Sequence, residues 1–176
     1  MILVRHAQPE IDPAVPAVEW RLSAAGRRQC VALAEELARL DPDAIYASPE
    51  PKARETAELL GAALELAITE LPDLREHDRR GTGFFASEQE FERHVLQLFR
   101  RPDEVVFGVE SAAECLVRFR GAIAEVRSRR ERQPLVVTHG TAMALFLASE
   151  TGHDAEQLWR SMRPAYYTVL EPRIEG

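Results

Sequence analysis

Two histidines of this sequence each follow a short apolar run that has the character of a buried strand. MILV is followed by Arg5 and His6, and PLVVT is followed by His139. A neutral imidazole is a nucleophile that accepts a phosphoryl group near pH 7. An adjacent arginine suits the same reaction, because its planar guanidinium binds phosphate oxygens in a bidentate manner. The Arg5–His6 pair therefore predicts a site for phosphoryl transfer, a reaction that depends mainly on positioning and charge neutralisation.

A leaving alkoxide also needs a proton, and Glu76 is the candidate that we assign to supply it. Glu76 lies in LREHD, within an irregular segment at residues 71–87. The residues alone also allow an ordinary loop carboxylate at this position. His77, His94 and His153 belong to no such pattern, and we expect them in loops or at the surface.

These side chains need a scaffold that brings strand ends together. Apolar patterning predicts strands at residues 1–4, 43–48, 64–69, 134–138 and 165–171, and helices at residues 23–40, 49–64, 87–99, 111–126, 141–151 and 154–160. Ser-x-x-Glu pairs at residues 87/90 and 111/114 are typical of capping boxes. Strands that alternate with helices indicate the α/β class, a three-layer α/β/α sandwich with a mostly parallel central sheet. Ligands bind beyond the carboxyl ends of such strands, so we expect His6 and His139 to meet at one edge of the sheet.

Composition narrows the possible partners. The chain has 176 residues, and we interpret residues 1–176 as a single domain. A net charge of −7 argues against binding to nucleic acid or to an anionic membrane surface. No stretch approaches the ~20 apolar residues of a membrane span, and the N-terminus does not resemble a signal peptide, so we expect a cytoplasmic protein. Cys30 and Cys115 fall in apolar helical patterns that predict burial, and no spacing is typical of a metal site.

Six short motifs run in order from residue 1 to about residue 145. They are VRHA, RLSAAGRRQC, SPEPKARETA, LRE, FGVESAAECLVRF and VVTHGT. In the same order they resemble the motifs of the histidine phosphatase superfamily, also called the phosphoglycerate-mutase-like family. Those motifs are the Arg-His-Gly/Ala triplet, the L-[ST]-x-x-G-x-x-Q-A helix start, the S-P-x-x-R-A-x-x-T-A segment, the acid segment, the G-E-S helix start (here displaced by one residue) and the second-histidine motif. The resemblance covers most of the chain and implies a phosphoglycerate-mutase-like fold.

The resemblance also implies a role for each matched residue. His6 is expected to be the nucleophile that becomes phosphohistidine, while Arg5 binds the phosphoryl oxygens and His139 donates a hydrogen bond to them. Glu76 is expected to protonate the leaving oxygen and then to activate the hydrolytic water. Gly140, next to His139, is grouped with the phosphate-binding residues. No metal and no organic cofactor is implied.

Two segments depart from the family pattern. The second phosphate-binding arginine aligns with Lys52, and Arg54 lies two residues later. Residues two apart on a helix point roughly 200° apart, so both cannot face one phosphate. We assign the contact to Lys52, as a point charge, and keep Arg54 as the alternative. After Glu76, the unusual HDRRGTGFF offers Arg79 and Arg80 either to an acidic substrate group or to a solvated charge cluster.

The expected function is hydrolysis of a phosphomonoester or another small phosphorylated substrate through a phosphohistidine on His6. Three alternatives remain open. A phosphohistidine protein phosphatase is favoured by a short chain, which suggests an open cleft that a phosphoprotein enters. A phosphoglycerate-mutase-like mutase is the second, and a catalytically weak phosphate-binding regulatory module, for which Lys52 argues, is the third. The oligomeric state is left open.

Overall fold

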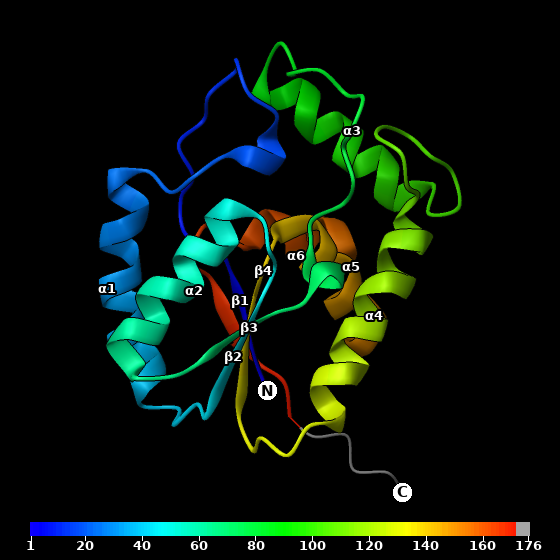
Figure 1. Cartoon of the computed structure of the whole chain (residues 1–176). Helices are drawn as coiled ribbons and strands as arrows, with labels where there is room; N and C mark the ends of the chain where they lie inside the picture. Colours follow the sequence, from blue (N-terminus) through cyan, green and yellow to red (C-terminus); the bar gives the residue numbers. More distant parts are fainter. Residues whose placement is uncertain (172–176) are drawn as a thin grey trace, which may run out of the picture.

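The computed structural model describes residues 1–171, which form a five-stranded sheet with helices on both faces (Figure 1). The strands are β1 (Ile2–Arg5), β2 (Ala44–Ala47), β3 (Ile68–Glu70), β4 (Pro134–Thr138) and β5 (Tyr167–Val169), in the spatial order β3-β2-β4-β1-β5. The first four are mutually parallel, and β5 pairs antiparallel with β1. The predicted α/β class with a mostly parallel sheet is confirmed.

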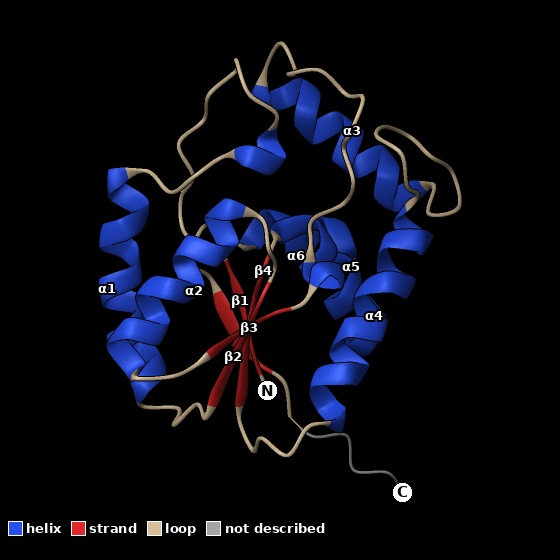
Figure 2. Ribbon diagram, in the orientation of Figure 1, coloured by secondary structure: helices blue, strands red, loops and turns tan. Residues whose placement is uncertain are grey.

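The helices divide between the two faces of the sheet, as Figure 2 shows. They are α1 (Ala24–Ala38), α2 (Pro51–Leu64), α3 (Glu88–Arg100), α4 (Ala112–Ser128), α5 (Gly140–Thr151) and α6 (Ala155–Ser161), with single 3-10 turns η1 (Ala17–Glu19) and η2 (Pro72–Leu74). Alternation along β1 explains the division, because Ile2 and Val4 pack with α1 and α2 while Leu3 packs with α4 and α5. The inner strands β1 and β4 are therefore buried on both faces, as their continuous apolar runs predicted, while the edge strands β3 and β5 are partly exposed.

Capping side chains begin several helices where the sequence places them. Ser111 and Glu114 form a complete capping box at α4. Ser87 accepts the Glu90 N–H at α3, but the Glu90 carboxylate accepts the Ala86 N–H, so only half of the expected box forms there. These local signals set the ends of the helices that flank the site.

The third strand begins later than expected. Residues 64–69 read as a strand, yet α2 runs to Leu64 and β3 begins at Ile68. Glu65 adopts a left-handed conformation with φ 57°, and Leu66 N–H donates to the Gly61 carbonyl. This turn ends α2, and it contains Glu65 and Leu66, which were predicted to belong to the strand.

The carboxyl ends of β1, β2 and β4 lie side by side beneath η1 and α3 (Figure 1). Val4 pairs with Val137 in register, and Ala47 pairs with the same residue from the other side. This alignment brings the residues that follow the three strands to one edge of the sheet. Within residues 1–171 no helix combines the length and the apolar character needed to cross a bilayer.

Candidate active site

The two strand-end histidines meet, as the topology predicted. The ring centroids of His6 and His139 lie 5.1 Å apart in an edge-to-face arrangement, and both side chains are buried. The backbone N–H of His6 extends the pairing of β1 with β4 by donating to the backbone carbonyl oxygen of Thr138 at 2.9 Å. The backbone at each strand end is thus fixed, and with it the position of each imidazole.

The tautomer of His6 is set by its own neighbour. Nδ1 lies 2.8 Å from the carbonyl oxygen of Ala7, which only accepts, so Nδ1 carries the hydrogen. The Ala7 N–H donates to Thr56 Oγ1 on α2, which holds that carbonyl in place. Burial lowers the pKa of His6 well below its ordinary value, and the charges of His139, Lys52 and Arg5 lower it further. His6 is therefore a neutral imidazole with an unprotonated Nε2 that no described residue hydrogen-bonds.

His139 is anchored from β2. Its Nε2 lies 2.8 Å from Ser48 Oγ and 3.7 Å from a Glu50 carboxylate oxygen. Nδ1 is buried and has no partner among residues 1–171. Burial, followed by the charge of Lys52, lowers the pKa of His139 well below its ordinary value. One ring nitrogen of this neutral histidine is left for a bound group.

Arg5 approaches the chain closely at Gly140, the first residue of α5. A Cβ on Gly140 would lie 3.1 Å from Arg5 Cζ and Nε, so any other residue here would require the Arg5 side chain to shift. Arg5 Nη1 donates to the Met162 carbonyl, while Nε is buried without a partner in the described chain. The guanidinium therefore has a fixed position and an unused donor.

Lys52, not Arg54, reaches the site. Lys52 is buried in the first turn of α2, where Nζ donates to Ala17 O at 2.8 Å and to Glu50 Oε2 at 2.6 Å. Its charge is among the causes that lower the pKa of both site histidines. Arg54 instead lies on the outer side of α2, with Nε 3.6 Å from Glu58. This placement favours Lys52 over Arg54 as the phosphate ligand, and the assignment stays a prediction.

Glu76 lies at the N-terminal end of α5 and is fully engaged there. Oε1 accepts the N–H groups of Ala142 at 2.9 Å and His77 at 3.0 Å, and Oε2 accepts the Thr141 N–H at 3.1 Å. Burial alone would raise the pKa of Glu76, but the charge of Arg79 and these hydrogen bonds outweigh it and hold the pKa far below the ordinary range. The predicted proton donor is thus ionised in the resting site.

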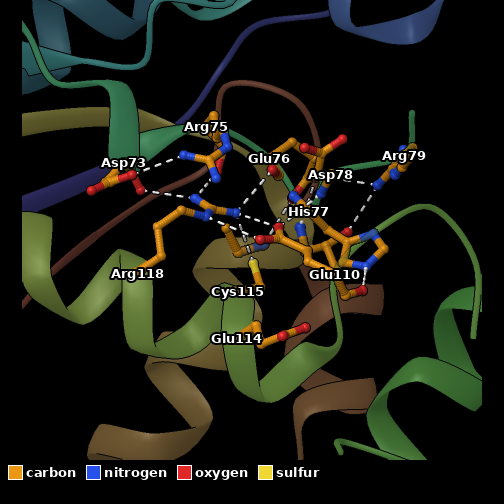
Figure 3. A network of polar contacts seen from close by, with 12 residues as sticks. Asp73, Arg75, Glu76, His77, Asp78, Arg79, Glu110, Glu114, Cys115 and Arg118 are labelled. Atoms are coloured by element: carbon orange, nitrogen blue, oxygen red, sulfur yellow. Dashed lines mark hydrogen bonds and ion pairs between the residues drawn. The ribbon is translucent and has the colours of Figure 1, made fainter. Parts of the chain in front are cut away.

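The loop that carries Glu76 is held by Arg118, a residue that the sequence reasoning missed (Figure 3). Arg118 donates to the carbonyls of Asp73, Arg75 and Glu76, and its Nη2 lies 2.5 Å from Glu110 Oε1. The sequence contains one indication of this role, because Arg118 is a charged residue on the same face of α4 as the buried Cys115. The carboxylate of Glu110 neutralises this buried arginine.

The remaining histidines differ in environment. His77 lies in a loop, as expected, but is buried there, with Nε2 2.8 Å from Glu110 O and the centroid of its ring 4.8 Å from that of Phe107. His94 departs from the expectation, because it lies half-buried on α3 with its ring centroid 4.9 Å from that of Phe85, whereas His153 is exposed in a loop as expected. Among residues 1–171, no group of three His, Cys, Asp or Glu side chains is arranged to hold a metal ion. Both cysteines are free and buried, as predicted.

Comparison with known proteins agrees with this geometry. Residues 1–176 match the sequence profile of the histidine phosphatase superfamily, branch 1. The chain is 32% identical over 168 residues to phosphoserine phosphatase 1 of Hydrogenobacter thermophilus, which covers 90% of this chain and 79% of that protein. It is 29% identical over 158 residues to the uncharacterized phosphatase PhoE of Bacillus subtilis, with coverage of 88% and 78%.

A solved structure shows the same similarity in three dimensions. Mycobacterial glucosyl-3-phosphoglycerate phosphatase, in complex with VO3, has a TM-score of 0.72 at 25% identity, with 95% of this chain and 90% of that chain covered. The match of the whole chain and the two histidines that the sheet brings together lead to one conclusion: this chain belongs to the histidine phosphatase superfamily.

Proposed function

We propose that this hydrolase removes the phosphoryl group from small phosphomonoesters through a phosphohistidine formed on His6. The observation that carries the proposal is the fixed tautomer of His6. Its Nδ1–H is committed to Ala7 O, so the lone pair of Nε2 is available for attack at phosphorus. The depressed pKa keeps this imidazole neutral at the pH of the cell.

Unused donors around His6 support binding of a phosphoryl group. Arg5 Nε and His139 Nδ1 are buried without partners among the described residues, and buried polar groups normally have them. Nδ1 of His139 carries the hydrogen when the Ser48 hydroxyl, which accepts the Glu50 N–H, donates its own hydrogen to Nε2. Lys52 has three N–H donors and uses two, on Ala17 and Glu50. Phosphoryl oxygens are acceptors that satisfy such donors, and the positive charges stabilise the transferring group.

The proposed reaction has two steps. In the first, His6 Nε2 forms a bond to phosphorus while the ester P–O bond breaks, and the leaving oxygen takes a proton from Glu76. In the second, Glu76 accepts a proton from water, the oxygen of that water attacks phosphorus, and the N–P bond breaks to release phosphate. Because the lowered pKa returns this proton to solvent in the resting enzyme, Glu76 takes up a proton again before the next leaving group departs.

The resting state of Glu76 suits the second step directly, because an ionised carboxylate is the form that accepts a proton. The first step needs the protonated form. The lowered pKa therefore makes leaving-group protonation the more demanding step for substrates whose alcohol is a poor leaving group.

The loops above the site favour a small substrate over a phosphoprotein. Lys52 Nζ donates a hydrogen bond to the carbonyl of Ala17. The ring centroids of Trp20 and Phe84, which lie on the loops after β1 and after Glu76, are 6.2 Å apart. A cavity of 250 Å³ remains between residues 13–17 and 82–84. The contacts between these loops support a small substrate rather than the phosphoprotein for which the alternative requires an open cleft. The names of two similar proteins, a phosphoserine phosphatase and a glucosyl-3-phosphoglycerate phosphatase, also support a phosphomonoester.

Hydrolysis of p-nitrophenyl phosphate by the wild type and by His6→Ala tests the proposal. We expect turnover by the wild type and its loss in the variant, with circular dichroism showing an intact fold. Unchanged turnover in His6→Ala refutes the nucleophile assignment. Faster dephosphorylation of a phosphorylated histidine-containing phosphotransfer protein than of any small ester would favour the protein phosphatase alternative.

A further inference from the structure

Arg79 is a second arginine at the site, supplied by the loop that follows Glu76. Its Nη2 lies 3.3 Å from Glu76 Oε2 and 3.0 Å from Thr141 Oγ1. The guanidinium stacks 4.6 Å from the Phe91 ring centroid, which restricts its plane. The side chain is 22% exposed, so solvent still reaches part of it.

The hydrogen-bonding capacity of Arg79 is only partly used. Nε is buried and has no partner among residues 1–171, and no hydrogen bond is made by Nη1 within the described chain. Arg80, the next residue, contrasts with this. It is 76% exposed, and its guanidinium is engaged by the carboxylate of Asp78. Of these two neighbouring arginines, Arg79 is the one that combines a restrained position at the site with unused donors.

The charge of Arg79 acts on the leaving-group side of the site. It is the largest of the influences that lower the pKa of Glu76 against the effect of burial, and it also lowers the pKa values of His139 and Arg5. The 250 Å³ cavity begins at the same loop, because Thr82 lines it and donates its N–H to the Arg79 carbonyl at 3.0 Å. A leaving group bound beside Glu76 would therefore lie next to this guanidinium.

We propose that Arg79 binds a carboxylate carried on the leaving alcohol, so that the enzyme selects phosphomonoesters of small hydroxy acids. This inference rests on the proposed function. The planar fork of arginine matches a carboxylate in a bidentate manner, which a lysine does not reproduce.

The same contact activates the acid. When a substrate carboxylate engages Arg79, the positive charge that holds Glu76 ionised is partly neutralised by the substrate. Glu76 then takes up a proton from water more readily, and it delivers that proton to the ester oxygen as the P–O bond breaks and the His6 N–P bond forms. Substrate choice and leaving-group protonation are coupled through one ion pair.

Matched substrates that differ only in the carboxylate test this inference. The pairs are 2-phosphoglycolate with ethyl phosphate, and O-phosphoserine with O-phosphoethanolamine. We expect the wild type to favour the acidic member of each pair in kcat/KM by about 10- to 100-fold, the range for a hydrogen bond to a charged group. In Arg79→Gln the ratio should fall towards one, Arg79→Lys should restore it only partly, and Arg80→Gln, the matched control, should keep it.

The pH profile separates binding from a structural role. Loss of the Arg79 charge should raise the pKa of Glu76, so the fall of kcat for ethyl phosphate at high pH should move to higher pH in Arg79→Gln. The inference is overturned if the wild type does not distinguish the members of either pair, or if Arg79→Gln loses both members equally with no change in the pH profile. Absence of turnover with every ester, p-nitrophenyl phosphate included, would instead refute the proposed function.

Discussion

Replacing Lys52 with methionine should separate the stability of the site from its affinity for phosphate. Nζ of Lys52 lies 2.6 Å from Glu50 Oε2, and the two side chains are only 7% and 8% exposed. Removing one member of a buried pair leaves the other charge without compensation, which typically costs ~3–5 kcal/mol in the free energy of unfolding. In Lys52→Met the Glu50 carboxylate keeps only the Glu76 N–H at 2.8 Å as a hydrogen-bond donor from the main chain.

The double variant Glu50→Gln/Lys52→Met provides the control. A glutamine still accepts the Glu76 N–H but carries no charge, so most of the lost stability should return. Affinity for vanadate should not return, because the ammonium is absent in both variants. Loss of one hydrogen bond between charged groups corresponds to about a 10- to 100-fold rise in the vanadate inhibition constant.

Urea denaturation and vanadate inhibition of p-nitrophenyl phosphate turnover measure the two effects. If Lys52→Met binds vanadate as the wild type does, Lys52 does not contact the phosphoryl group. If the single and double variants are equally stable, Lys52 does not compensate the buried charge of Glu50.

Three further predictions follow from the geometry of the site. Gly140→Ala places a Cβ 3.1 Å from Arg5 Cζ, so the Arg5 side chain must shift. We therefore expect the vanadate inhibition constant to rise by about tenfold, which corresponds to about 1.4 kcal/mol of binding free energy. An unchanged constant would contradict the role of Arg5 in binding the phosphoryl group. Because the pKa values of His6 and His139 are lowered, the unfolded chain binds protons that the folded chain does not. Stability to urea should therefore fall below pH 6.5 by up to ~1.4 kcal/mol per pH unit for each histidine, and His139→Gln should reduce this slope; equal stability at pH 7.5 and 5.5 would exclude it. Glu76→Gln should slow hydrolysis of alkyl phosphates by about 100-fold or more, because their leaving alkoxide needs a proton. With p-nitrophenyl phosphate the same variant should release a burst of p-nitrophenolate, because that leaving group needs no proton while hydrolysis of the phosphohistidine still needs a base. Steady release without a burst would argue against these two roles of Glu76.

The fold was predictable because its signals are local. Continuous apolar runs gave β1 and β4, and the Ser111–Glu114 pair gave the start of α4. The meeting of His6 with His139 followed from topology, since parallel strands place their carboxyl ends together. Helical geometry likewise identified Lys52 and Arg54 as mutually exclusive.

The rest of the site depends on contacts between distant segments, which patterning does not reveal. Glu50 accepts from both Lys52 and the Glu76 backbone, although Glu76 lies 26 residues away. Arg118 holds the Glu76 loop from 42 residues away. The ionised state of Glu76 also escaped prediction, because its pKa is set by Arg79 and by the N-terminal end of α5 rather than by its own sequence neighbourhood alone.

The central claim is that a phosphoryl group resides on His6 during turnover. Rapid chemical quenching of a single turnover with a ³²P-labelled ester, followed by peptide mapping in alkali, tests it most directly. We expect an alkali-stable, acid-labile label on the peptide that contains His6, formed and lost at rates that match turnover and absent in His6→Ala. Label on another residue, or turnover without any labelled protein, would contradict a phosphohistidine on His6.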